Sequence, residues 1–179
     1  MSKSAQAKKP IFKKWWFWVI IVVVLIGIGV VASKGDEATK VGDNGGSSQG
    51  QTEFVVGDVI AFDGKEVTVK SVERNWNSGN QFITPKDGKE FVKVNVLIEN
   101  KSDNVVSYNV FDWKIQDSDG SIETTSIGAS ADDDLSSGEL AKGGKKSGSI
   151  VFEVPAGDTG LKLHYQPSFW SNKEIIIKL

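Results

Sequence analysis

Few residues of this chain are of types that carry out catalysis or bind a metal. The chain has one histidine and no cysteine, which excludes thiolate catalysis, disulfides and zinc–thiolate sites. His164 shares its side of an alternating segment with Lys162, so we expect it on the surface of a strand. A lone histidine without a cysteine partner is a poor metal site.

Two acidic motifs carry the oxygen ligands that Ca²⁺ prefers. Asp132–Asp134 is a run of carboxylates in a Gly/Ser-rich stretch, and Asp117-Ser-Asp-Gly120 matches only the opening of a calcium loop, without the later ligands and the closing Glu. We interpret the first as a solvated loop and the second as a hairpin turn. Gly143-Gly-Lys-Lys146 has the wrong spacing for a phosphate loop and is interpreted as a turn. We therefore assign no catalytic, cofactor-binding or metal-binding residue and expect no enzyme.

Aromatic residues in polar surroundings are the remaining candidates for a site. Trp76 and Phe82 lie in a stretch rich in Asn, Ser and Gln, and Phe169 and Trp170 lie in a second one. Such side chains can anchor a protein partner or stack on a sugar. They can equally cover the ends of a hydrophobic core. We predict binding loops at these four residues, with the core-covering interpretation left open.

The start of the chain predicts its cellular location and membrane topology. Five lysines, with no acidic residue among them, precede eighteen uncharged and almost wholly apolar residues, Trp15–Ala32. As a helix this run reaches about 27 Å, close to the ~30 Å hydrocarbon core of a bilayer. Lysines on one side and an aromatic cluster at Trp15–Trp18 indicate that the N-terminus stays in the cytoplasm. We expect a cytoplasmic tail at 1–14, a transmembrane signal anchor at 15–32 and an extracellular remainder.

A cleaved signal peptide is the alternative to an anchor. Val30 and Ala32 are small enough to precede a cut before Ser33. The apolar run is longer than the ~7–15 residues of most signal peptides, which favours the anchor. Cleavage after Ala32 would give a secreted protein.

Charge and composition divide the rest of the chain. All 23 acidic residues and 16 of the 21 basic ones lie beyond the apolar run, which gives this part a net charge of about −7. Such a surface argues against nucleic acid as a partner. Residues 33–53 are rich in Gly, Ser and polar residues, which predicts a flexible linker with a reach of about 25 Å.

Residues 54–179 show the period of β-strands. Apolar and polar residues alternate in five segments, 92–98, 111–115, 150–154, 161–165 and 175–179. Val67 and Val69 belong to a further strand, and Val72 breaks their phase, which predicts a bulge near Lys70–Ser71. Ser126–Leu140, rich in Gly, Ser and Asp, is predicted to be a loop with at most one helical turn.

Turn signals complete the prediction of an all-β fold. Three Asp-Gly pairs, at 63–64, 87–88 and 119–120, indicate hairpins because Asp-Gly accepts the positive φ of tight turns. Strands at this spacing predict a β-sandwich of seven to eight strands, preceded by one transmembrane helix.

Three blocks of this region resemble a known family. They are Phe54-Val-Val-Gly-Asp-Val-Ile60, the stretch from Asp87 to Asn100, and Leu140 to Pro155 with its Gly-Gly-Lys-Lys-Ser-Gly core. They resemble the extracytoplasmic family of domain of unknown function 4352, which is common on Gram-positive envelopes. Lys142 departs from the pattern, since a proline is expected there. The resemblance covers essentially 54–179. It implies an immunoglobulin-like sandwich, similar to that of a small secreted mycobacterial immunoprotective antigen, and no catalytic residues.

These observations predict a non-catalytic, membrane-anchored module of the cell envelope. We expect a single-pass protein with an extracellular immunoglobulin-like domain that binds an envelope protein or a cell-wall polymer. A sensory or regulatory ectodomain that binds a small ligand or a cell-wall fragment is the alternative. The short cytoplasmic tail is too small to signal alone, so this alternative needs a membrane partner.

Overall fold

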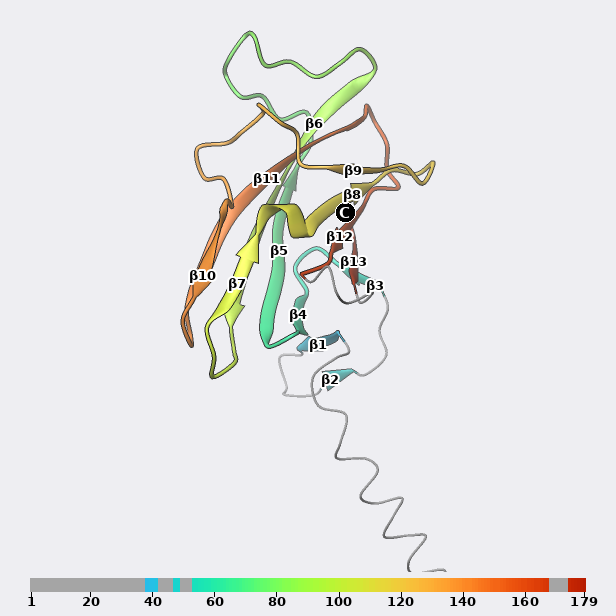
Figure 1. Ribbon diagram of the computed structural model, residues 1–179. Helices are drawn as coiled ribbons and strands as arrows, with labels where there is room; N and C mark the ends of the chain where they lie inside the picture. Colours follow the sequence, from blue (N-terminus) through green and yellow to red (C-terminus); the bar gives the residue numbers. More distant parts are fainter. Residues whose placement is uncertain (1–37, 42–46, 49–52, 168–173) are drawn as a thin grey trace, which may run out of the picture. The chain divides into compact units, whose positions relative to one another are not determined.

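The computed structural model describes residues 38–41, 47–48, 53–167 and 174–179. These residues form an all-β sandwich (Figure 1). Among them, no helix is long and apolar enough to span a membrane. The predicted transmembrane segment, 15–32, lies outside the described residues.

One layer of the sandwich is a large sheet of six strands. Its order is β11 (Lys145–Pro155), β6 (Lys89–Asn100), β5 (Lys65–Glu73), β4 (Val59–Phe62), β1 (Thr39–Val41) and β2 (Ser47–Ser48). All neighbours in it pair antiparallel. The long strands β5, β6 and β11 dominate the layer in Figure 1.

Two smaller sheets face it. A five-stranded sheet has the order β3 (Glu53–Val55), β13 (Ile175–Lys178), β12 (Lys162–Tyr165), β8 (Trp113–Gln116) and β9 (Ile122–Thr124), in which β3 and β13 pair parallel. A two-stranded sheet pairs β10 (Ser137–Leu140) with β7 (Val106–Asn109). A 3₁₀ helix, Val110–Asp112, connects β7 to β8.

The main core fills the space between the layers. In β6, four alternate side chains, Val92, Val94, Val96 and Ile98, are fully buried in it. They meet Trp113 and Tyr165 from the opposite layer, whose rings are stacked at a tilt of 34° with centroids 4.3 Å apart. In β6, the predicted alternation thus separates the side chains that enter the main core from those that point away from it. In the predicted segment 111–115 it holds for Trp113 and Ile115, whereas Phe111 lies in the 3₁₀ helix and is exposed.

The predicted bulge is confirmed. The pairing of β5 with β6 shifts register between Val69 and Ser71. One extra residue reverses the side on which the following side chains lie. Val72 therefore packs against the main core, on the same side of the sheet as Val67 and Val69.

Two of the three predicted Asp-Gly hairpins are confirmed. Asp63 and Gly64, with φ of 50° and 72°, join β4 to β5, and Asp119–Gly120 lies between β8 and β9. Asp87–Gly88 is a turn at the end of the long connection between the paired strands β5 and β6, so it does not form a tight hairpin.

The number and extent of the strands differ from the prediction. The described residues form thirteen strands, not seven or eight, because strands of two to four residues are too short to show a period. Residues 137–140, predicted to be loop, form β10. Within the predicted linker, β1 pairs with β4, and Lys40 Nζ lies 2.6 Å from Asp58 Oδ1.

A buried ion pair fixes the ends of β5, β6 and β11 to one another. The Glu90 side chain is only 3% exposed and pairs with the Arg74 guanidinium. Its carboxylate also accepts the backbone N–H groups of Asn75 and Gly157, at 3.0 and 2.9 Å. Arg74 Nη1 donates to the Asp158 carbonyl at 2.6 Å. The hydrogen bond from Arg74 is the main cause that holds the pKa of Glu90 below its usual value.

Glu90→Gln is expected to lower the free energy of unfolding by about 2–3 kcal/mol at neutral pH, because Arg74 loses its charged partner. A carboxylate whose pKa is lowered in the folded state stabilises it fully above the unfolded pKa of about 4.3, and this contribution is lost as pH falls through the folded pKa. On going from neutral pH to below about pH 4.3, the free energy of unfolding measured in urea should therefore fall less for the variant than for the parent. The exposed Glu139→Gln is the control. Equal acid sensitivity of the variant and the parent would contradict this role.

Candidate functional site

The candidate site lies on the outer face of the large sheet, where the start of β6 pairs with the C-terminal half of β11. Phe91 and Val151 turn away from the main core there. With Ala129 they form a second, smaller core, and each is less than 5% exposed. A sheet that buries apolar residues on both faces must be covered by other segments on its outer side. Two loops supply that cover.

The first loop covers Phe91 from the side of β5. It runs from Arg74 to Gly88, between β5 and β6. The Trp76 N–H donates to the Phe91 carbonyl at 3.0 Å, and the two rings meet edge to face with centroids 6.4 Å apart. Ile83 also packs on the second core. This loop is therefore attached to the sheet through its apolar side chains.

Asparagine side chains shape the tip of this loop. Asn77 Oδ1 accepts the Gly79 N–H at 2.7 Å, and Asn80 Oδ1 accepts the Phe82 N–H at 3.0 Å. Such bonds from a side chain to the backbone two residues on stabilise tight turns. The turn leaves Phe82 pointing outward, with 85% of the residue exposed.

The second loop connects β9 to β10 and runs along β11, the outermost strand of the large sheet. It runs from Thr125 to Ser136 and bonds to β11 at both ends: the Ser126 N–H donates to the Val151 carbonyl at 2.8 Å, and the Leu135 N–H donates to the Ser149 carbonyl at 2.9 Å. Leu135 enters the main core, where a Cβ on Gly148 would lie 2.5 Å from its Cα. Glycine is therefore required at 148 for this close approach.

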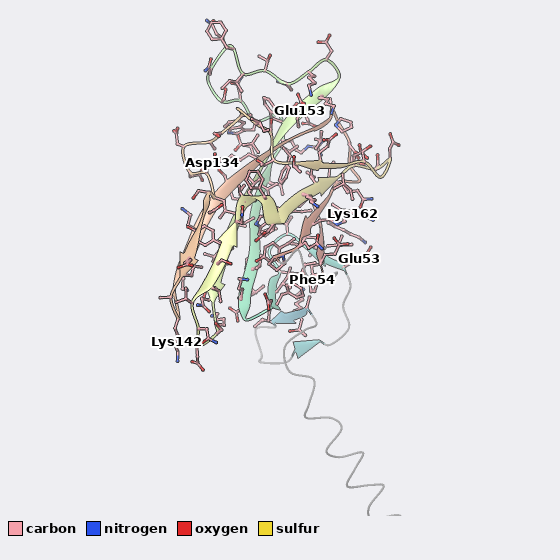
Figure 2. All side chains as sticks on the ribbon, viewed as in Figure 1. Glu53, Phe54, Asp134, Lys142, Glu153 and Lys162 are labelled. Atoms are coloured by element: carbon pink, nitrogen blue, oxygen red, sulfur yellow. The ribbon has the colours of Figure 1, made fainter. Side chains whose placement is uncertain are left out.

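The tip of the second loop also carries an exposed apolar residue. Gly128, with φ of 96°, turns the chain so that Ala129 is buried against Phe91. Its neighbour Ile127 is left 98% exposed. In Figure 2, Glu153 marks the end of β11 beside the first loop, and Asp134 marks where the second loop returns to the strand.

A groove of about 570 Å³ lies between the two loops. Phe91, Lys89 and Glu153 contribute to it from the sheet, and Phe82 and Ile127 from the loop tips. The remaining lining consists of small or polar residues and one further apolar residue: Ile83, Thr84, Lys86, Glu123, Thr124, Thr125, Ser126, Gly128 and Ala129.

The charges of the groove form two ion pairs. Lys86 Nζ lies 3.1 Å from Glu153 Oε2, and Lys89 Nζ lies 3.9 Å from Glu123 Oε1. Burial alone would raise the pKa of Glu153, but the backbone N–H and the ammonium of Lys86 hold it below its usual value. Glu153 is therefore an ionised, paired carboxylate at neutral pH, and it serves as an acceptor rather than a proton donor.

The four predicted binding residues have different placements. Trp76 is half-buried against Phe91 and covers the second core. Phe82 is exposed on the rim of the groove. Phe169 and Trp170 lie outside the described residues. Ile127 was missed by sequence reasoning, although an isolated large apolar residue in a Gly/Ser/Asp-rich loop was an available signal.

The prediction that His164 lies on the surface is wrong. It is 7% exposed, with Nδ1 3.1 Å from Glu174 Oε2 and Nε2 3.0 Å from Gln116 Oε1. Its strand β12 lies between β8 and β13. Side chains from both neighbours therefore cover a position that would be exposed on an edge strand.

The acidic motifs have structural partners. Asp133 Oδ1 accepts the Ser149 hydroxyl at 2.7 Å and lies 3.1 Å from Lys93 Nζ, which links the second loop to the sheet. Asp117 Oδ1 accepts the Ser121 N–H at 2.8 Å within the β8–β9 turn. Across the part of the chain that the structure describes, no group of three or more His, Cys, Asp or Glu side chains is placed to hold a metal ion.

Residues 54–175 match the family described as "Domain of unknown function (DUF4352)". The chain belongs to this family. The match begins at β3 and ends in β13, so the groove lies wholly within the family domain. No protein of curated description matches the chain.

Three solved structures are similar to this fold. The yjhA protein from Bacillus subtilis is 18% identical, with 70% of this chain and 98% of that one covered at a TM-score of 0.54. A putative lipoprotein (ycdA) from the same species is 19% identical, with 73% of this chain and only 39% of that one covered, at 0.56. The secreted protein MPT63 from Mycobacterium tuberculosis is 12% identical, with 74% of this chain and 100% of that one covered, at 0.50. At these identities the likeness shows a shared fold.

Trp76 and Phe82 should respond differently to substitution by alanine. Trp76→Ala removes a half-buried ring from the second core and should cost about 2–3 kcal/mol of stability, somewhat less than the ~3–5 kcal/mol of a fully buried tryptophan. Phe82→Ala removes an exposed ring and should change stability by less than about 0.5 kcal/mol. Thermal and urea unfolding of both variants measure the difference. A large loss for Phe82→Ala would show that its ring is structural and remove it from the binding site.

Proposed function

We propose that this protein is a membrane-anchored, non-catalytic binding module of the cell envelope, whose extracellular immunoglobulin-like domain binds a partner protein through the groove. One observation carries this proposal: two large apolar residues, Phe82 and Ile127, are almost fully exposed on facing loops that are each fixed to a rigid sheet. Exposed apolar groups gathered at a concave surface are typical of interaction sites. Loops on a rigid scaffold commonly carry recognition.

The non-catalytic part of the proposal rests on the side chains of the groove. Its two carboxylates, Glu123 and Glu153, each pair with a lysine. General acid catalysis by a carboxyl group requires a raised pKa, and that of Glu153 is lowered. The lining residues of the described groove include no Ser–His or Cys–His arrangement.

The proposed location of the module rests on its N-terminal sequence and on the proteins in which similar folds occur. The lysine-rich tail and the apolar run Trp15–Ala32 support a single-pass anchor with an extracellular domain. Similar folds occur in a putative lipoprotein of Bacillus subtilis and in a secreted mycobacterial protein. A small ligand or a cell-wall fragment is the second candidate for the groove, because its volume is within the ~300–1,000 Å³ of small-molecule sites.

Protease treatment of intact cells tests the topology. An external protease should cut between residues 33 and 53 and release a folded fragment that contains Phe54–Leu179. A cytoplasmic marker protein that remains intact is the control for cell integrity. Protection of the linker would contradict the proposed orientation. Recovery of the protein from the medium with Ser33 at its N-terminus would replace the anchor by a cleaved signal peptide.

Photo-cross-linking in living cells tests the binding role. A photoreactive phenylalanine analogue at Phe82 should give a discrete adduct with another protein, because this side chain lies on the rim of the groove. The same analogue at Phe111, which is 57% exposed and does not line the groove, is the matched control. Identical adducts from both positions, or none from Phe82, would contradict a protein-binding role for this surface.

A further inference from the structure

The charge of the groove restricts what can bind in it. Within its described lining, the charged residues are two lysines and two glutamates, which form the pairs Lys86–Glu153 and Lys89–Glu123. Glu153 accepts both the ammonium and the backbone N–H of Lys86, the latter at 2.7 Å. With two positive and two negative groups, the described lining carries no net charge and offers a strongly charged ligand no net attraction. The groove therefore does not favour anionic cell-wall polymers or strongly charged peptides.

Its apolar groups are arranged to hold one bulky side chain. Phe91 and Ala129, buried to 4% and 3% exposure, belong to the packed second core and provide a firm base. Phe82 and Ile127 project from opposite loops at the rim. A side chain placed between the two rim residues would remove apolar surface on three groups from water at once.

The polar groups between these apolar positions are neutral. Thr84, Thr124 and Ser126 bring hydroxyl groups into the lining, and each hydroxyl can both donate and accept a hydrogen bond. This combination suits the N–H and C=O groups of a peptide backbone. A sugar stacks on open aromatic faces. Of the aromatic residues in the described lining, Phe91 is covered by Trp76 and Phe82 alone offers an exposed ring.

We propose that the groove binds a short, extended, uncharged peptide segment that inserts one bulky apolar side chain between Phe82 and Ile127. This proposal rests on the proposed protein-binding function and adds the chemical class of the ligand. The two loops need little rearrangement to bind, because the first is fixed through Trp76 and Ile83 and the second through Leu135. Loops held in place before binding lower its entropic cost.

Selection from a peptide library tests the ligand class. The full-length chain in lipid nanodiscs is used to select from displayed random nonapeptides. The enriched sequences should carry no net charge and share one large aliphatic or aromatic residue. A synthetic consensus peptide should bind the parent, and Phe82→Ala and Ile127→Ala should each weaken it at least tenfold by fluorescence anisotropy. Val105→Ala and Phe111→Ala, which remove exposed apolar residues outside the groove, should stay within twofold.

A charge variant tests the neutrality argument separately. Glu123→Gln preserves the size of the side chain but leaves Lys89 without its carboxylate partner. Selection on this variant should admit peptides that carry an Asp or Glu, which the parent rejects. An unchanged preference would overturn the role of the ion pairs in specificity.

The failures of the two proposals are distinguishable. Three results would overturn the peptide proposal. The parent could enrich charged peptides, it could enrich none, or the consensus peptide could bind Phe82→Ala and Ile127→Ala as tightly as the parent. If soluble cell-wall fragments displaced the peptide and Phe82→Ala weakened their binding as much as that of the peptide, the ligand of the groove would be a glycan and the peptide proposal would be overturned. The protein-binding function survives these results if the cross-link from Phe82 still forms, and fails with them if it does not.

Discussion

The antiparallel pairing of β6 with β11 is the constraint on which the rest of the structure depends. It runs without interruption from Lys145 opposite Glu99 to Pro155 opposite Lys89. On its inner face, side chains such as Val94 and Ile150 form the centre of the main core. On its outer face, Phe91 and Val151 form a second core that needs its own cover. The two connecting loops are held in place because they supply that cover.

This arrangement explains how loops rich in Asn, Ser and Gly present a defined surface. Each loop has a part packed on the second core and an exposed tip: Ile83 is partly buried and Ala129 is buried there, whereas Phe82 and Ile127 are left in solvent. The Arg74–Glu90 pair fixes the start of the first loop. Recognition surfaces gain affinity when their anchors are rigid before binding. The second core is therefore a structural element whose consequence is a fixed spacing between two exposed side chains.

Much of the fold could be predicted from the sequence because strand burial has a period of two. The alternation in β6, the bulge at Lys70–Ser71 and the Asp63–Gly64 turn depend on local patterns, and each is present. The environment of His164 could not be predicted, because it depends on which strands lie beside β12. Short strands such as β10 could not be predicted for a related reason. Its four residues lie in a Gly- and Ser-rich segment and form a strand because they pair with β7.

The candidate site shows the same limit more sharply. Trp76 and Phe82 lie six residues apart in one polar stretch, and their sequence signals are alike. One is drawn onto Phe91 because the chain at Trp76 still pairs with β6 through its backbone N–H. The other comes after the asparagine turns have carried the chain away from the sheet. In this loop, the backbone hydrogen bond at Trp76 thus separates the aromatic residue that covers a core from the one that is left exposed.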